Sequence, residues 1–116
     1  MKTHQIYLRF LNVLHALEND PGMPAIDLEC RRLLEEIAVR QDADNALTVT
    51  EAMALSSIAS PATLHRKLNQ LLELGLIQHH FHGDNRRTKF IICTETAIRY
   101  FERAGRAMQR SLGLCN

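Results

Sequence analysis

Apolar residues in the first 40 positions recur every three or four residues, which is the spacing of one buried face of an amphipathic helix. This pattern predicts a first helix over residues 4–19 and a second over about 24–40. The first should end in the Asn-Asp-Pro-Gly turn of residues 19–22, because proline cannot continue a helix and glycine permits a chain reversal. Pro24 suits the first turn of the second helix. The two apolar faces comprise Ile6, Phe10, Val13, Leu14, Leu17, Ile26, Cys30, Leu33, Leu34 and Ile37.

The pattern changes after the second helix. The polar run of residues 41–45 predicts a loop, and the short, largely β-branched run of residues 47–49 predicts an edge strand. Thr50 is a suitable N-cap for a following helix, which we expect to extend to about Ser57.

Ser60 and Pro61 mark the start of the next helix, since serine is a favoured N-cap and proline a favoured first helical residue. We expect this helix over residues 61–73. Gly75 should end it, because glycine readily adopts the left-handed conformation common after a helix C-terminus. The apolar inner face comprises Leu64, Leu68, Leu71 and Leu72.

Two β-prone runs follow, over residues 77–81 and 89–93, and the loop of residues 82–88 between them predicts a hairpin. Thr94 is expected to cap a final helix over about 95–112. The apolar side of that helix comprises Ile98, Phe101, Met108 and Leu112, with Tyr100 and Ala104 alongside.

Two helices joined by a turn and followed by a hairpin predict a winged helix-turn-helix. The expected fold class is therefore mostly α with a small β-hairpin wing and flanking N- and C-terminal helices. A chain of 116 residues suits a single domain over residues 1–116. Within it, we expect residues 1–40 to supply core and dimerisation helices, residues 47–94 to form the winged helix-turn-helix, and residues 95–112 to form a second dimerisation helix.

The net charge of +1 conceals an uneven distribution. Residues 1–51 contain five Lys and Arg against nine Asp and Glu, whereas residues 52–116 contain nine against four. A nearly neutral protein with one basic face can bind a polyanion through that face.

The helix of residues 61–73 has the features of a DNA-recognition helix, because its leucines would hold it on the domain and no acidic residue precedes Glu73. Arg66 suits guanine or a phosphate, and Asn69 or Gln70 suits adenine, through hydrogen bonds in the major groove. The predicted DNA contacts at this helix are Ser60, Ala62, Thr63, His65, Arg66, Lys67, Asn69 and Gln70.

Cations also gather in the predicted hairpin loop. Arg86 and Arg87 lie at its tip and Lys89 lies just beyond, where a wing would meet the DNA backbone or minor groove. Asp84 is expected to support the wing by holding Arg86 in a bidentate ion pair. In the recognition helix, Lys67 is expected to point toward a DNA backbone.

Over about residues 47–97, the chain resembles the MarR (multiple antibiotic resistance regulator) family. The motifs that carry the resemblance are Thr63-Leu64-His65-Arg66, Leu71-Leu72-Glu73-Leu74-Gly75-Leu76-Ile77 and Asp84-Asn85-Arg86. The family's wing ends in an L-T-x-x-G pattern, whereas here Cys93 replaces the leucine and Ala97 the glycine. The resemblance implies that Thr63, His65 and Arg66 face the groove and that Arg86 is the wing residue.

The resemblance implies sequence-specific regulation of transcription with double-stranded DNA as the partner. Family members usually have a longer C-terminal dimerisation region, so here a homodimer would form from the helices of residues 4–19 and 95–112. Their apolar stripes support a dimer with two half-sites, although both stripes could instead pack on their own domain. By resemblance, a small-molecule effector could bind between the dimer helices and the DNA-binding part, but no sequence pattern defines such a pocket.

The sequence gives less support to metal binding, catalysis or a membrane location. His79, His80 and His82 lack a supporting carboxylate or cysteine, so neither a metal nor another cofactor is predicted. No phosphate loop, nucleophile elbow or paired carboxylate indicates an enzyme. No apolar run approaches the length of a membrane span, and the N-terminus does not resemble a signal peptide.

The cysteines are three in number, widely spaced and without a CxxC pattern, which indicates reduced thiols and a cytoplasmic protein. Cys30 and Cys93 suit small core positions better than a redox sensor, and Cys115 lies near the chain end. Two other functions are compatible with the same fold. One is a protein-interaction or assembly module without specific DNA readout, and the other is DNA binding in replication initiation or plasmid partition.

Overall fold

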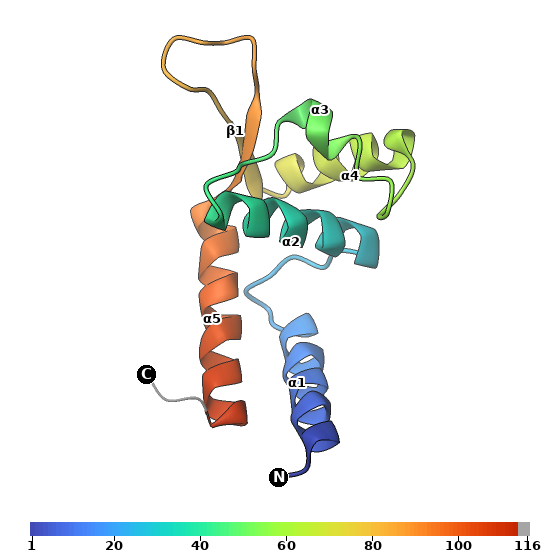
Figure 1. Ribbon diagram of the computed structural model, residues 1–116, viewed down its shortest axis with the longest axis vertical. Coiled ribbons are helices and arrows are strands. Elements are labelled where there is room, and N and C mark those ends of the chain that lie inside the picture. Colours follow the sequence, from blue (N-terminus) through green and yellow to red (C-terminus); the bar gives the residue numbers. More distant parts are fainter. Residues whose placement is uncertain (114–116) are drawn as a thin grey trace. The chain divides into compact units, whose positions relative to one another are not determined.

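The computed structural model describes residues 1–113. Over that range the chain forms helices and one antiparallel hairpin, which confirms the predicted mostly α class with a small β wing (Figure 1). The elements are α1 (Thr3–Glu18), α2 (Leu28–Asp42), α3 (Val49–Ala52), α4 (Pro61–Glu73), β1 (Ile77–His80), β2 (Phe90–Cys93) and α5 (Glu95–Leu112).

The chain divides into two compact units. The winged-helix unit comprises Ile26–Ala97, and the flanking-helix unit comprises Met1–Ala25 together with the described residues from Ile98 onward. The division separates α1 from α2, whereas the sequence pattern groups both helices in residues 1–40. It also falls within α5.

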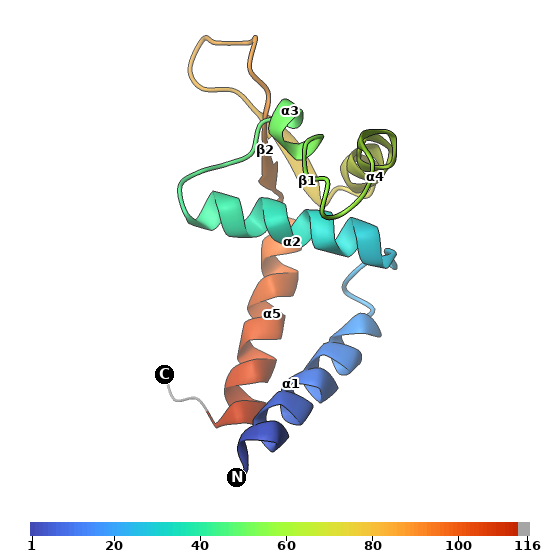
Figure 2. The ribbon, with the colours of Figure 1, turned by 45° about the vertical axis from the view of Figure 1, so that its right-hand side comes forward.

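The winged-helix unit has a continuous apolar core in which α2 packs against α4 and β2. α3, α4 and the hairpin loop lie on the same side of α2 in two views (Figure 1, Figure 2). Each fully buried leucine or isoleucine stabilises such a core by about 1.5–3 kcal/mol. Its buried residues are Cys30, Leu33, Leu34, Ile37, Leu47, Ala52, Leu64, Leu68, Leu71, Leu76, Ile77, Ile91, Cys93 and Ala97.

The predicted bounds of α4 are confirmed at both ends. The Ser60 side chain accepts a hydrogen bond from the Thr63 amide at 3.3 Å, and Pro61 is the first helical residue. Gly75 has a φ of +72°, the left-handed conformation that ends a helix without steric strain for glycine. Local signals therefore fix this helix.

The hairpin follows directly from α4. β1 and β2 pair antiparallel, with Ile77 opposite Cys93 and His80 opposite Phe90, and each strand is one residue shorter than predicted. The Thr94 hydroxyl accepts a hydrogen bond from the third amide of α5 at 3.4 Å, which confirms Thr94 as the cap of that helix.

The predicted start of α2 is wrong, because the helix begins at Leu28 and leaves Pro24 outside it. The Asp27 carboxylate accepts a hydrogen bond from the Cys30 amide at 2.8 Å and so caps the helix. Aspartate is a strong N-cap, whereas Met23, the residue before the proline, offers no side-chain acceptor comparable to a carboxylate. The better cap therefore overrides the proline signal.

The predictions for α3 also need correction. Thr48, not Thr50, caps this helix, in a reciprocal capping box with Glu51. The predicted edge strand shrinks to a single bridge between Thr48 and Phe90, because the residues after Thr48 already belong to the helix. The helix ends at Ala52, five residues earlier than predicted.

The flanking-helix unit buries few of its apolar residues. In the α1 stripe only Val13 and Leu17 are buried, whereas Phe10 and Leu14 are partly exposed and Ile6 is 46% exposed. In α5 none of the predicted stripe is buried within this unit: Ile98, Phe101, Met108 and Leu112 are all at least partly exposed. The prediction of a buried face therefore holds only in part for these helices.

A polar contact joins the end of α1 to α5 within the same unit. The Asp20 carboxylate accepts hydrogen bonds from the Gly22 amide at 2.7 Å and from Arg103 Nε at 3.0 Å. A Cβ at Gly22 would lie 2.2 Å from the Arg103 guanidinium, so glycine allows this close approach. A groove of about 420 Å³ also lies in this unit, lined by Arg9, Asn12, Val13, Ala16, Leu17, Ala107 and Ser111.

Candidate nucleic-acid interface

The outer face of α4 is a polar surface whose one acidic residue, Glu73, lies at the C-terminal end of the helix. Leu64, Leu68 and Leu71 are at most 2% exposed and hold the helix on the core, so that the opposite face turns outward. Thr63 is partly exposed. The exposed members of the predicted contact set on this helix are Ala62, His65, Arg66, Asn69 and Gln70.

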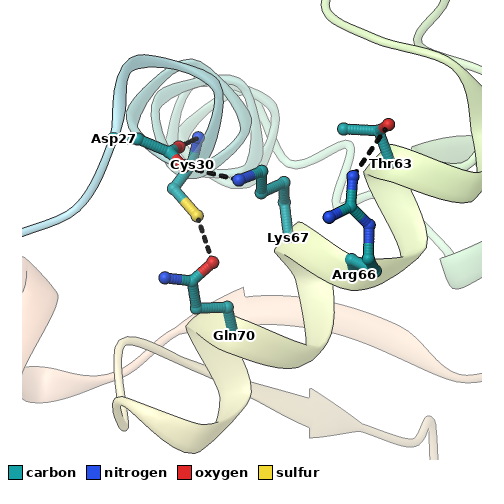
Figure 3. Close-up of polar contacts among 6 residues, drawn as sticks. All are labelled: Asp27, Cys30, Thr63, Arg66, Lys67 and Gln70. Atoms are coloured by element: carbon teal, nitrogen blue, oxygen red, sulfur yellow. Dashed lines mark hydrogen bonds and ion pairs between the residues drawn. The ribbon is translucent and has the colours of Figure 1, made fainter.

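Hydrogen bonds hold Arg66 along the outer face of α4. The Thr63 hydroxyl oxygen accepts a hydrogen bond from the Ser60 hydroxyl at 3.1 Å and another from Arg66 Nη2 at 3.2 Å (Figure 3). A guanidinium has five N–H donors, so this bond leaves others for a base edge or a phosphate. The arrangement presents Arg66 as a preoriented donor.

Lys67, for which the sequence predicts a DNA contact, does not share that face. Its ammonium forms an ion pair with Asp27, the N-cap of α2, and its side chain is only 15% exposed (Figure 3). The hydrogen bond from Lys67, followed by that from the Cys30 amide, holds the pKa of Asp27 below its ordinary value. The same hydrogen bond raises the pKa of Lys67. One position after Arg66, the helix has turned this side chain toward α2.

Gln70 lies on the exposed face of α4 but is also hydrogen-bonded to α2. Although the residue is exposed, its Oε1 accepts a hydrogen bond from the Cys30 thiol at 3.4 Å (Figure 3). The amide nitrogen keeps two N–H donors and the oxygen keeps a second lone pair, so the hydrogen bond restrains the side chain without removing the groups that suit adenine.

The hairpin loop presents Arg86, Arg87 and Lys89 as exposed cations, as predicted from its sequence. In the described chain, however, no ion pair joins Asp84 to Arg86. The Arg86 guanidinium instead lies 5.0 Å from the centre of the Phe81 ring, in a cation–π contact. An aromatic ring thus takes the supporting role that we assign to the carboxylate from sequence.

Beside the wing, a cleft of about 310 Å³ brings together hydroxyl groups and cations that the sequence analysis did not connect. Its base is fixed by a hydrogen bond from the Val49 amide to the Lys89 carbonyl at 3.0 Å. This contact joins residues 40 positions apart, so no local pattern reveals it. The cleft is lined by Thr48, Val49, Thr50, Arg87, Thr88 and Lys89.

Two of the hairpin histidines, His80 and His82, contact aromatic rings. His82 stacks on Phe90 with ring centres 4.1 Å apart, and His80 meets His82 edge to face at 5.4 Å. Within residues 1–113, no group of three His, Cys, Asp or Glu side chains is placed to hold a metal ion. In the same range, no helix is both long enough and apolar enough to cross a membrane.

Cys30 and Cys93 are 0% and 5% exposed, which confirms them as small core residues. Burial raises the pKa of each thiol to about 11, so both remain protonated and weakly nucleophilic near neutral pH. Cys115 lies outside the described residues.

Comparison with known proteins supports the fold. No protein-family model and no curated protein sequence matches this chain. Among solved structures, MepR from S. aureus bound to DNA superposes with a TM-score of 0.57 at 20% identity, over 93% of this chain and 79% of MepR. A MarR mutant from E. coli bound to operator DNA gives 0.58 at 16% identity, over 95% and 73%. NadR in complex with 4-hydroxyphenylacetate gives 0.55 at 16% identity, over 92% and 67%.

These similarities, together with the observed helices and hairpin, define the class of protein: a winged helix-turn-helix domain. More narrowly, the chain has a MarR-like winged-helix fold, which confirms the resemblance seen in its sequence motifs.

Proposed function

We propose that this protein is a sequence-specific, double-stranded DNA-binding regulator of transcription. The observation that carries the proposal is that the winged-helix unit combines an outer face of α4 that has no acidic residue before Glu73 with a cationic wing. In this proposal, α4 enters the major groove and residues 84–89 contact the flanking backbone or minor groove. The MepR and MarR structures, which are complexes with DNA, support it.

Specific roles follow from the accessible side chains. Arg66 and Asn69 are proposed to contact base edges, where each good contact contributes about 1–3 kcal/mol of discrimination. Thr63 and His65 are proposed to face the groove beside them. Arg86, Arg87 and Lys89 are proposed to contact phosphates or the minor groove, which adds affinity for every sequence.

The test is DNA binding by the wild type and by Arg86→Ala, measured on random and genomic duplex fragments over a salt series. We expect the wild type to enrich a palindromic fragment, with a steep decrease in affinity as salt rises. Arg86→Ala should weaken binding to all fragments and reduce the salt slope by about one.

Arg106→Ala is a matched control, because it removes an exposed arginine from α5 rather than from the wing. Its salt slope should equal that of the wild type. Absence of binding by the wild type at low salt would contradict the proposal and favour a winged-helix module that contacts a protein partner.

We further propose that the active form is a homodimer that pairs through the flanking helices α1 and α5. A two-fold symmetric dimer would place two recognition helices on half-sites about one helical turn apart. The large side chains left exposed on these helices support this proposal: Ile6, Tyr7, Leu8 and Ile98 are 40–60% exposed.

A small-molecule effector and a cytoplasmic location complete the proposed function. The NadR structure, a complex with 4-hydroxyphenylacetate, supports an effector, and the protonated, buried thiols of Cys30 and Cys93 suit a reducing compartment. Release of the enriched fragment on titration with 4-hydroxyphenylacetate would support regulation by a compound of this kind. Unchanged binding up to millimolar concentrations would exclude this compound as the effector.

A further inference from the structure

The side chains of Arg66 and Lys67 leave α4 in different directions (Figure 3). Arg66 stays on the exposed face beside Thr63, whereas Lys67 extends to Asp27 at the N-terminus of α2. Lys67 would have to leave this partner in order to reach a phosphate. A basic residue in the recognition helix is therefore engaged inside the protein.

Asp27 holds two groups at once. It accepts a hydrogen bond from the Cys30 amide, which fixes the carboxylate to the first turn of α2, and it binds the Lys67 ammonium of α4. One turn further along α4, Gln70 Oε1 accepts a hydrogen bond from the Cys30 thiol. Two successive turns of α4 are thus attached to the same turn of α2.

Apolar packing decides which face of α4 turns outward, but it fixes small rotations and shifts of the helix on the core less strictly. Burial of Leu64, Leu68 and Leu71 is favourable but non-directional, so leucines tolerate small displacements better than hydrogen bonds do. Hydrogen bonds and ion pairs depend on distance and angle, and supporting contacts of this kind hold a binding site in its productive geometry. The direction of Arg66 depends on that geometry.

We propose that Lys67 and Asp27 are positioning residues, whose ion pair fixes the orientation of α4 so that Arg66 and Asn69 meet the correct bases. Lys67 itself does not contact DNA. This inference rests on the DNA-binding function proposed above. Lys67 and Asp27 would thus affect base specificity without contacting DNA themselves.

The test compares Lys67→Met with Lys89→Met, two variants that remove the same charge and keep a similar stem. Each is measured on a duplex that the wild type selects from a random-sequence pool and on an unselected random duplex, over a salt series. Lys67→Met should lose about tenfold or more on the selected duplex, with random-duplex affinity and salt slope unchanged. Lys89→Met should weaken both duplexes equally and reduce the slope by about one.

Asp27→Asn completes the test, because an asparagine oxygen can still cap α2 while the charge opposite Lys67 is lost. We expect Asp27→Asn to reproduce the loss of Lys67→Met and the double variant to lose no more than either single one. Helix content by circular dichroism and the melting temperature verify that every variant is folded at the assay temperature.

Each other outcome removes the inference. A reduced slope in Lys67→Met would show a phosphate contact, and a lower melting temperature without loss of discrimination would show a purely structural role. Additive losses in the double variant would show that the two residues act separately. If the wild type itself selects no duplex, the DNA-binding proposal falls, whereas selection by the wild type with any of these results removes only the positioning role.

Discussion

The two units differ in how well each covers its own apolar residues. In the described chain, fourteen of the sixteen buried hydrophobic residues belong to the winged-helix unit, and only Val13 and Leu17 belong to the flanking-helix unit. Yet α1 and α5 both have apolar residues at helical spacing along their length. The winged-helix unit can therefore be stabilised by its own core, whereas the flanking helices lack comparable burial.

Helices in proteins gain most of their stability from tertiary packing, so the helices of a unit with only two buried hydrophobic residues need another apolar surface. The contact between Asp20 and Arg103 joins them, but a single ion pair that remains partly open to solvent contributes little. A second copy of the chain would supply matching stripes. The difference between the units is consistent with the function proposed above, in which one unit binds DNA and the other pairs the protomers.

The largest effect that this comparison predicts follows from a charge in the exposed stripe of α1. Ile6→Glu should leave the winged-helix core intact, convert a dimer to a monomer, and weaken binding to a palindromic duplex by about 10²–10⁴-fold through loss of two-site binding. Sedimentation and DNA titration measure the two effects. Val39→Glu is the control, because Val39 is an exposed apolar residue of α2, in the other unit (63% exposed, against 46% for Ile6). Equal oligomeric states for both variants would contradict pairing through the flanking helices.

Replacement of a leucine by alanine should destabilise the protein much more in the winged-helix unit than in the flanking-helix unit. Leu34→Ala, at a position 1% exposed in the winged-helix unit, should lower the free energy of unfolding by about 2–5 kcal/mol. Leu8→Ala, at a position 51% exposed in α1, should change it by about 0.5 kcal/mol or less at concentrations where the protein is monomeric. Urea unfolding measures both. Equal losses would mean that Leu8 is packed as tightly as Leu34.

The sequence predicted best where signals are local. Ser60, Pro61 and Gly75 fix the two ends of α4 with their own backbone preferences, and those bounds are confirmed. The start of α2 was predicted wrongly from Pro24, and Asp27 is identified as the cap only by the hydrogen bond that it accepts from the Cys30 amide.

The candidate interface shows the same limit. Helical periodicity predicts the exposure of Ala62, His65, Arg66, Asn69 and Gln70, but it cannot show that Lys67 has a partner 40 residues away in Asp27. In the wing, the local spacing suggested an ion pair between Asp84 and Arg86, whereas the folded hairpin brings the Phe81 ring under the guanidinium. Tertiary partners decide the roles of these charged side chains.

The smallest effect concerns one carboxylate in each unit. The pKa values of Asp20 and Asp27 both lie below their ordinary value of 3.8, so each stabilises the fold above that pH and loses this contribution as pH falls through its lowered pKa. For Asp27 the largest cause is the hydrogen bond from Lys67, whereas for Asp20 it is the bond from the Gly22 amide. An asparagine keeps an acceptor for an amide but loses the charge. Asp27→Asn should therefore lower the stability at pH 7 more than Asp20→Asn does.

Urea unfolding of both variants and the wild type, repeated between pH 2 and pH 7, tests this ranking. The differences from the wild type should disappear toward the acid end, where the carboxylates are protonated in both states, and should shrink in high salt because both pairs reach the solvent. A larger loss for Asp20→Asn would show that Arg103, rather than the Gly22 amide, is the main partner of Asp20. The flanking helices would then depend on their ion pair more than the winged-helix unit depends on its own, because their apolar packing contributes so little.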